Sequence, residues 1–108
     1  MQGYDVLLTP TLATAPVAPA ALCVDDEALS LADFIERSHR FSPSTAWFNA
    51  SGQPAKSVPL WWNECGLPIG SEFAGALGAE ELLFSLPAQL EEVAPWSGRI
   101  PVLNALSI

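Results

Sequence analysis

The sequence is poor in the side chains that nucleic-acid sites and many enzyme sites require. Its 108 residues include one histidine, two cysteines and four lysine or arginine residues. These four cations are scattered along the chain, and twelve acidic residues give a formal net charge of -8. Nucleic acids and anionic membranes bind clustered cations, so the charge pattern argues against both as partners.

Long apolar runs and targeting signals are also lacking. No stretch of about 18 consecutive apolar residues occurs, so the sequence predicts no membrane span. The N-terminus has no cationic region and carries Asp5, so we expect no signal peptide and a cytoplasmic protein. A metal site would need Cys23, His39 and Cys65 to meet without any local ligand spacing, so we expect none. Reduced thiols are favoured over a disulfide between the two cysteines.

Enough hydrophobic residues are present, half of the total, to predict a folded chain with one domain over residues 1–108. The apolar run YDVLLTPT predicts a strand in residues 1–11 that is buried on both faces. Residues 12–24 are rich in proline and alanine and are predicted to form an extended loop.

Residues 25–41 are predicted to form a helix. Asp25 or Asp26 would cap its N-terminus, and a start at Ser30 is nearly as good. Apolar residues at helical spacing form one face: Leu31, Phe34 and Ile35. The segment that follows, 42–54, is rich in turn-forming residues and is expected to contain no regular element.

Residues 55–75 are predicted to form a β-hairpin, with Gly66 in the turn at a positive φ. Pro59 and Pro68 cannot donate to a ladder, so each should lie at an edge, a bulge or a strand end. A second helix is predicted over 79–95, broken near Pro87.

Apolar residues at helical spacing give this second helix one hydrophobic face: Leu82, Leu83, Leu86, Leu90 and Val93. Residues 97–108 form a tail with weak signals. The pattern is α/β, with about three strands including a hairpin and two helices. Two helices cannot cover both faces of such an apolar sheet, so the sequence resembles a partial slice of a larger sandwich.

Catalytic combinations are scarce. Lys56 and Ser57 have the residue types of a base and a nucleophile, but neighbours in a strand point to opposite faces of the sheet. No G-x-S-x-G or S-x-x-K pattern occurs, and His39 would have to serve any serine or cysteine nucleophile alone. The three adjacent acidic pairs would splay apart on helices: Asp25 with Asp26, Glu80 with Glu81 and Glu91 with Glu92. We therefore expect no catalytic, cofactor-binding or metal-binding residue in this chain.

Four stretches, in order and at about the same spacing, resemble the C-terminal portion of the amidase signature family. They are GYDVLLTPTLATAP, FNASGQPAKSVPL, GLPIGSEFAG and GAEELLFSLPAQLEEVAPW. Within the family the resemblance is strongest to bacterial amidases of the 6-aminohexanoate-cyclic-dimer hydrolase type. It covers the chain from Gly3 to about Trp96.

The resemblance implies an α/β sandwich with a large mixed sheet flanked by helices. It implies hydrolysis of carboxamides, or ammonia transfer from them, by a serine activated through a second serine and a lysine, without a metal or organic cofactor. Those residues belong to N-terminal and central segments of the family, and carried over they fall on no residue of this sequence. Lys56, Glu72 and Pro87 depart from the family pattern, because each introduces a polar group or a break where a packed sandwich favours neither.

Two functions follow as hypotheses. The first is a truncated or split amidase fragment with a structural role, whose partner is the N-terminal amidase portion. In it, Trp47, Phe48 or Trp61 would form the outer wall of an acyl pocket, although core packing is the favoured interpretation. The second is a free-standing interaction module that forms a homo-oligomer through exposed apolar faces. In either case the chain alone is predicted to be inactive.

Overall fold

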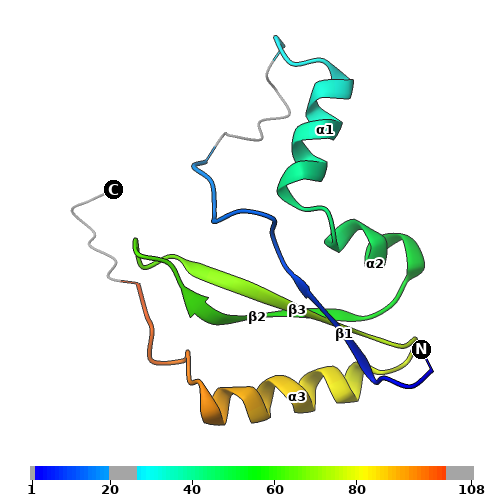
Figure 1. Cartoon of the computed structure of the whole chain (residues 1–108), viewed down its shortest axis with the longest axis vertical. Coiled ribbons are helices and arrows are strands. Elements are labelled where there is room, and N and C mark those ends of the chain that lie inside the picture. The colour runs from blue at the N-terminus through cyan, green and yellow to red at the C-terminus, as the bar shows by residue number, and fades with distance from the viewer. Residues whose placement is uncertain (1, 20–26, 102–108) are drawn as a thin grey trace.

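The computed structural model describes residues 2–19 and 27–101, which contain three strands and three helices (Figure 1). In chain order these are β1 (Val6–Pro10), α1 (Leu31–Phe41), α2 (Thr45–Ser51), β2 (Ala55–Trp62), β3 (Pro68–Gly75) and α3 (Glu80–Val93). The predicted α/β class and the three strands with a hairpin are confirmed, but the prediction of two helices is wrong by one. No helix in these ranges is both long and apolar enough to cross a membrane.

The three described strands form one antiparallel sheet in the order β1-β3-β2. The hairpin turn between β2 and β3 has Gly66 at φ +76°, as predicted. The side-chain oxygen of Asn63 accepts hydrogen bonds from the N–H groups of Cys65 and Leu67, which fixes this turn. Pro68 begins β3, and Pro59 adjoins the register shift in β2, so both prolines lie where no ladder donor is required.

β1 is less buried than its sequence predicts. The strand was expected within residues 1–11 with both faces covered, but it spans Val6–Pro10 at the outside of the sheet. The Leu8 side chain is 61% exposed and that of Leu7 is 41% exposed. The reason is tertiary: among the described residues no strand lies beyond β1.

α1 begins at Leu31, not in the Asp25–Asp26 region, and the alternative cap at Ser30 is the one observed. The Ser30 hydroxyl accepts a hydrogen bond from the Asp33 N–H at 3.1 Å, which satisfies one free donor of the first turn. Asp25 and Asp26 lie outside the described residues. Leu31 and Ile35 are 75% and 57% exposed, and Figure 1 shows α1 extending away from the sheet.

α2 falls in the segment 42–54, which was expected to contain only turns. This helix has seven residues, and it ends at Gly52, whose φ of +74° is readily adopted only by glycine. Phe48 is 7% exposed and belongs to the small set of buried side chains. Helices this short have too few residues for a periodic pattern, so the turn-forming residues around α2 dominated the prediction.

α3 continues through Pro87, so the predicted break is wrong. Pro87 is itself buried and lies one turn after Leu83, on the face that contacts the sheet. The ring therefore contributes apolar contact that offsets the lost backbone hydrogen bond. The predicted apolar face is only partly correct, because Leu82 is 39% and Val93 is 86% exposed.

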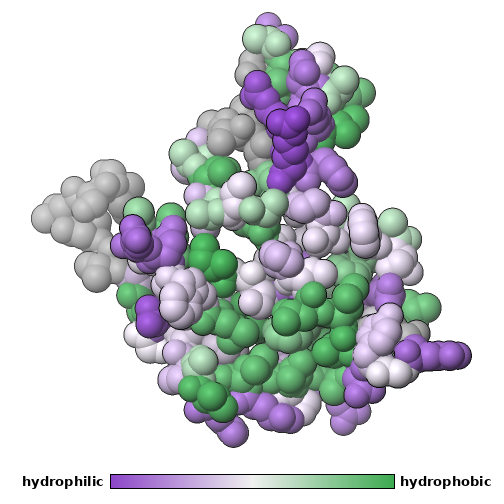
Figure 2. Space-filling view, in the orientation of Figure 1, coloured by the Kyte–Doolittle hydropathy of each residue, from purple (hydrophilic) through white to green (hydrophobic). Residues whose placement is uncertain are grey.

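The core lies between α3 and one face of the sheet. Val58, Phe73 and Leu83 form its centre, and partly buried hydrophobic side chains pack around them: Val6, Leu60, Leu86, Leu90 and Trp96. The chain exposes 8159 Å², whereas a compact monomer of 11.5 kDa exposes about 5,800 Å². Figure 2 shows hydrophobic side chains gathered across the middle of one face of the molecule.

The Pro/Ala segment and the tail carry no regular element where they are described. Residues 12–19 and 97–101 contain neither helix nor strand. The remaining parts of the predicted loop and tail, 20–24 and 102–108, lie outside the described residues.

Candidate functional site

Lys56 and Ser57 are adjacent in β2, and their side chains diverge. Lys56 Nζ lies 4.6 Å from the centroid of the Phe84 ring, on the side of the sheet that α3 covers. The Ser57 hydroxyl is hydrogen-bonded to the hydroxyl of Thr11, on the opposite side. The lysine therefore cannot take a proton from this serine, because a general base must lie within hydrogen-bond reach.

A polar cluster occupies the face of the sheet opposite α3. It consists of Thr9 on β1, Thr11 just after this strand, Ser57 on β2 and Glu72 on β3. Thr9 Oγ1 donates to Glu72 Oε2 at 3.4 Å. Gly70 leaves room for the two bonded hydroxyls, since a Cβ at this position would lie 2.5 Å from Thr11 Oγ1 and 2.7 Å from Ser57 Oγ.

Glu72 is the one charged residue among the buried side chains of the described chain, with 6% exposure. Burial raises the pKa of its carboxyl above the ordinary value, and the hydrogen bond from Thr9 partly opposes this. The Ser57 hydroxyl is bonded to Thr11 rather than to this carboxyl, although the two residues are register partners. The cluster therefore holds the sheet face together and supplies no activated nucleophile.

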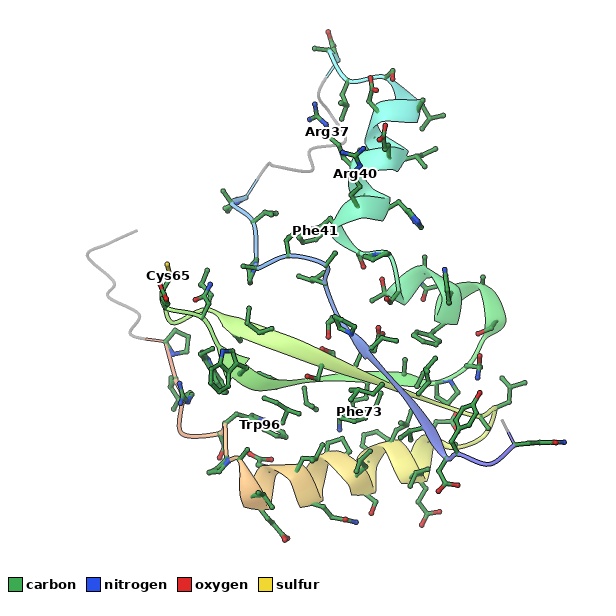
Figure 3. All side chains as sticks on the ribbon, viewed as in Figure 1. Arg37, Arg40, Phe41, Cys65, Phe73 and Trp96 are labelled. Atoms are coloured by element: carbon green, nitrogen blue, oxygen red, sulfur yellow. The ribbon has the colours of Figure 1, made fainter. Side chains whose placement is uncertain are left out.

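The other residues considered as catalytic or metal-binding do not converge. His39 lies exposed in the last turn of α1, and Cys65 is an exposed free thiol in the hairpin turn. Cys23 is outside the described residues. Figure 3 shows Cys65 at the hairpin turn and Arg37 and Arg40 on α1, on separate parts of the molecule. Within residues 2–19 and 27–101, no group of three metal-ligating side chains occurs.

The acidic pairs of α3 lie at its two ends, Glu80 with Glu81 in the first turn and Glu91 with Glu92 in the last. Glu80, Glu81 and Glu92 are exposed. The first pair stabilises the positive end of the helix dipole. These carboxylates have the surroundings of a solvated helix surface rather than of an acid–base site.

The aromatic residues proposed for a pocket wall divide into two groups. Phe48 is buried, which agrees with the favoured interpretation of core packing, whereas Trp47 is 66% and Trp61 is 71% exposed. The neighbouring Trp62 has a role that the sequence analysis missed. The Arg99 guanidinium stacks over its ring at 4.0 Å, a cation–π contact that links the tail to the hairpin.

Two shallow hollows lie on either side of the Trp62–Arg99 stack. The first has a volume of about 630 Å³ and includes Trp61, Asn63 and Pro95 in its lining. The second, of about 500 Å³, is lined by Trp96 and prolines on its other side. Figure 3 places Trp96 near the end of α3, between the helix and the sheet. Phe73 also lies between the helix and the sheet. The first hollow has one carboxylate in its lining, that of Glu64, and the lining of the second contains neither a nucleophile nor a general base.

The described residues form an α/β arrangement, in which an antiparallel three-stranded sheet packs against α3. The model of the family described as Amidase matches residues 1–84. The chain belongs to the amidase family.

The 6-aminohexanoate-cyclic-dimer hydrolases of Paenarthrobacter ureafaciens and of Pseudomonas sp. strain NK87 are each 39% identical to this chain over 105 residues. The match covers 94% of this chain and 21% of each relative. The solved structure of a 6-aminohexanoate cyclic dimer hydrolase with substrate matches with a TM-score of 0.81 and 36% identity. It covers 93% of this chain and 21% of that chain. This sequence therefore spans about a fifth of the length of its relatives.

Proposed function

We propose that this chain is a structural segment of an amidase, and that the catalytic serines and lysine belong to other segments of such an enzyme. The observation that carries the proposal is the state of β1. Its sequence has the continuous apolar character of a strand covered on both sides, yet Leu8 is 61% exposed. The segment therefore requires a further part of the sheet for its burial.

The apolar surface of α1 supports the same proposal. Leu31 and Ile35 lie on the same face, one turn apart, and both are more than half exposed. An amphipathic helix is stabilised mainly by packing of its apolar face, and a short isolated helix is marginal in water. Association with the rest of an amidase would cover this face as well as β1.

The proposed role includes no chemistry by the chain alone. The Ser57 hydroxyl is hydrogen-bonded to Thr11, and no hydrogen bond joins it to Lys56 or Glu72 in the described structure. We therefore expect hydrolysis only when the remaining amidase segments are present. A cytoplasmic site of action stays a prediction from the sequence.

Fragment complementation tests the proposal. A version of the Paenarthrobacter ureafaciens hydrolase that lacks the fifth matched by this chain would be mixed with the full 108-residue chain. We expect a one-to-one complex by light scattering and recovery of hydrolysis of the 6-aminohexanoate cyclic dimer. The matched fifth of the hydrolase itself serves as the positive control. The proposal would be contradicted if the matched fifth of the hydrolase restored activity to the truncated enzyme and this chain did not bind to it.

A second function, self-association, is favoured by a different observation. Trp47 and Trp61 are large exposed aromatics, and aromatic residues are enriched at protein–protein interfaces. If the chain forms a stable homo-oligomer, its solution mass is a multiple of 11.5 kDa at micromolar concentration. A homo-oligomer that does not exchange with the truncated hydrolase would favour the interaction module over the amidase segment.

A further inference from the structure

The first hollow, beside the Trp62–Arg99 stack, has a charge of each sign in its lining. Glu64 supplies a carboxylate and Arg99 supplies a guanidinium. No ion pair joins these two side chains within the described residues, where the one salt bridge is that between Arg40 and Glu36. Two opposite charges that line one hollow without pairing can bind a molecule that carries the complementary charges at its two ends.

The Arg99 side chain is oriented by contacts within the chain. Its guanidinium carbon lies 4.0 Å from the centroid of the Trp62 ring, and its backbone N–H donates to the Trp96 carbonyl at 2.9 Å. Stacking on a ring uses the face of the guanidinium and leaves the N–H groups, which lie in its plane, for other partners. A carboxylate suits these N–H groups, because the two can form a pair of parallel hydrogen bonds.

Glu64 lies on a turn whose shape is fixed. The side-chain oxygen of Asn63 accepts hydrogen bonds from the N–H groups of Cys65 at 3.0 Å and Leu67 at 2.9 Å. The Asn63 N–H donates to the Leu67 carbonyl at 3.0 Å and closes the hairpin. The Glu64 side chain is exposed and makes no hydrogen bond within the described residues. Its carboxylate is therefore available to an ammonium group, which has three donors.

Apolar side chains make up much of the remaining lining. Leu60, Trp61 and Pro95 contribute to it, and Trp61 is 71% exposed. A methylene chain that lies on an indole ring is removed from water, which favours its binding. The volume of about 630 Å³ falls within the range of small-molecule sites, about 300–1,000 Å³.

From these observations we infer that the first hollow is a binding site for linear ω-amino acids, in which a methylene chain separates a carboxylate from an ammonium group. The carboxylate binds Arg99, the ammonium group binds Glu64, and the chain lies against Trp61. A ligand with a single charge makes only one of the two charged contacts, so the site selects the zwitterion. The inference goes beyond the proposed function and does not depend on it, because residues of this chain alone form the site.

Titration of the 108-residue chain with 7-aminoheptanoic acid tests the inference. Heptanoic acid and heptylamine are matched controls, because each has the same chain and lacks one of the two charges. Calorimetry should give a dissociation constant of about 1 mM for the zwitterion, a value expected for a small ligand with few polar contacts. Each control ligand should bind about fivefold to tenfold more weakly, since it loses one charge-assisted contact.

Two variants show which charge recognises which end of the ligand. Glu64→Gln should bind 7-aminoheptanoic acid and heptanoic acid equally, whereas Arg99→Gln should bind 7-aminoheptanoic acid and heptylamine equally. Arg99→Lys keeps the charge and should still favour the zwitterion over heptylamine. Glu81→Gln is the control, because Glu81 is exposed in the first turn of α3, and affinity should change less than about twofold. Circular dichroism checks that each variant is folded.

Three results would overturn the inference. Equal affinity of the unmodified chain for all three ligands would show binding by apolar surface alone. Unchanged affinity for the zwitterion in both Glu64→Gln and Arg99→Gln would place its binding elsewhere. A folded chain that binds none of the ligands would show that the hollow is not a site. None of these results affects the proposed function, which is tested by association with the truncated hydrolase.

Discussion

Lys56 and Ser57 are neighbours in the chain, yet the groups at the ends of their side chains contact different layers of the molecule. The lysine amine lies 4.6 Å from the Phe84 ring centroid on α3, whereas the serine hydroxyl is bonded to Thr11 on the other face of the sheet. Alternation along β2 enforces this separation. Lys56 and Ser57 have the residue types of a base and a nucleophile, but they make their contacts on opposite faces of the sheet.

Loss of the Ser57 hydroxyl should not affect amide hydrolysis. In the complex with the truncated hydrolase, Ser57→Ala should retain the rate of cyclic-dimer hydrolysis within about twofold, because this serine is hydrogen-bonded to Thr11 and not to a base. Steady-state rates at saturating chain concentration provide the measurement. A loss of activity by orders of magnitude, with binding unchanged, would mean that Ser57 acts in catalysis. The 108-residue chain alone should hydrolyse no simple amide above background.

Glu72 should make the stability of the chain depend on pH. Burial raises the pKa of its carboxyl in the folded state above that in the unfolded state, where it is about 4.3. The folded state therefore binds the proton more tightly, and its contribution to stability is lost as pH rises through the folded pKa. Glu72→Gln cannot ionise and can still accept from Thr9. Urea unfolding between pH 4 and 8 should show a smaller decline for this variant than for the unmodified chain.

The comparison with Glu64→Gln provides the control for this pH experiment, because Glu64 is exposed in the hairpin turn. This control should leave the pH dependence of the unfolding free energy unchanged. An identical decline in the Glu72→Gln variant and in the unmodified chain would contradict the role of Glu72.

Gly70 should tolerate no methyl group. A Cβ would lie 2.5 Å from Thr11 Oγ1, so Gly70→Ala must displace the hydroxyl pair and should cost about 1–3 kcal/mol of unfolding free energy. Gly98→Ala is the matched control, since a Cβ there meets nothing within 4 Å. Urea denaturation of both variants gives the values. Combining Gly70→Ala with Thr11→Ala removes the nearest atom, Thr11 Oγ1, and should restore part of the loss. Equal costs for Gly70→Ala and Gly98→Ala would refute the crowding.

Leu83 should matter far more than its neighbour Leu82. Leu83 is 3% exposed at the centre of the core, so Leu83→Ala should cost about 2–5 kcal/mol. Leu82 is 39% exposed, and Leu82→Ala should cost less than about 1 kcal/mol. Thermal or urea unfolding of the two variants separates them. Similar losses would show that α3 contacts the sheet through a different face.

Local signals predicted most of the elements. The Ser30 cap, the Gly66 turn and the positions of Pro59 and Pro68 each depend on a few adjacent residues, so the sequence contains the information directly. Lys56 and Ser57 also point to opposite faces of the sheet, as alternation along a strand requires. Failures came where packing competes with local preference: α3 continues through Pro87 because the ring is buried against the sheet.

The sequence by itself determined the α/β class, the hairpin and the divergence of Lys56 from Ser57, because periodicity and turn chemistry act over a few residues. Tertiary structure alone decided which apolar residues are covered. Leu83 and Leu82 carry the same side chain, and only the position of the sheet buries the first and exposes the second. The sequence of β1 predicts a strand that is buried on both faces. Burial of a strand depends on neighbours that are distant in the chain, and none of the described strands lies beyond β1.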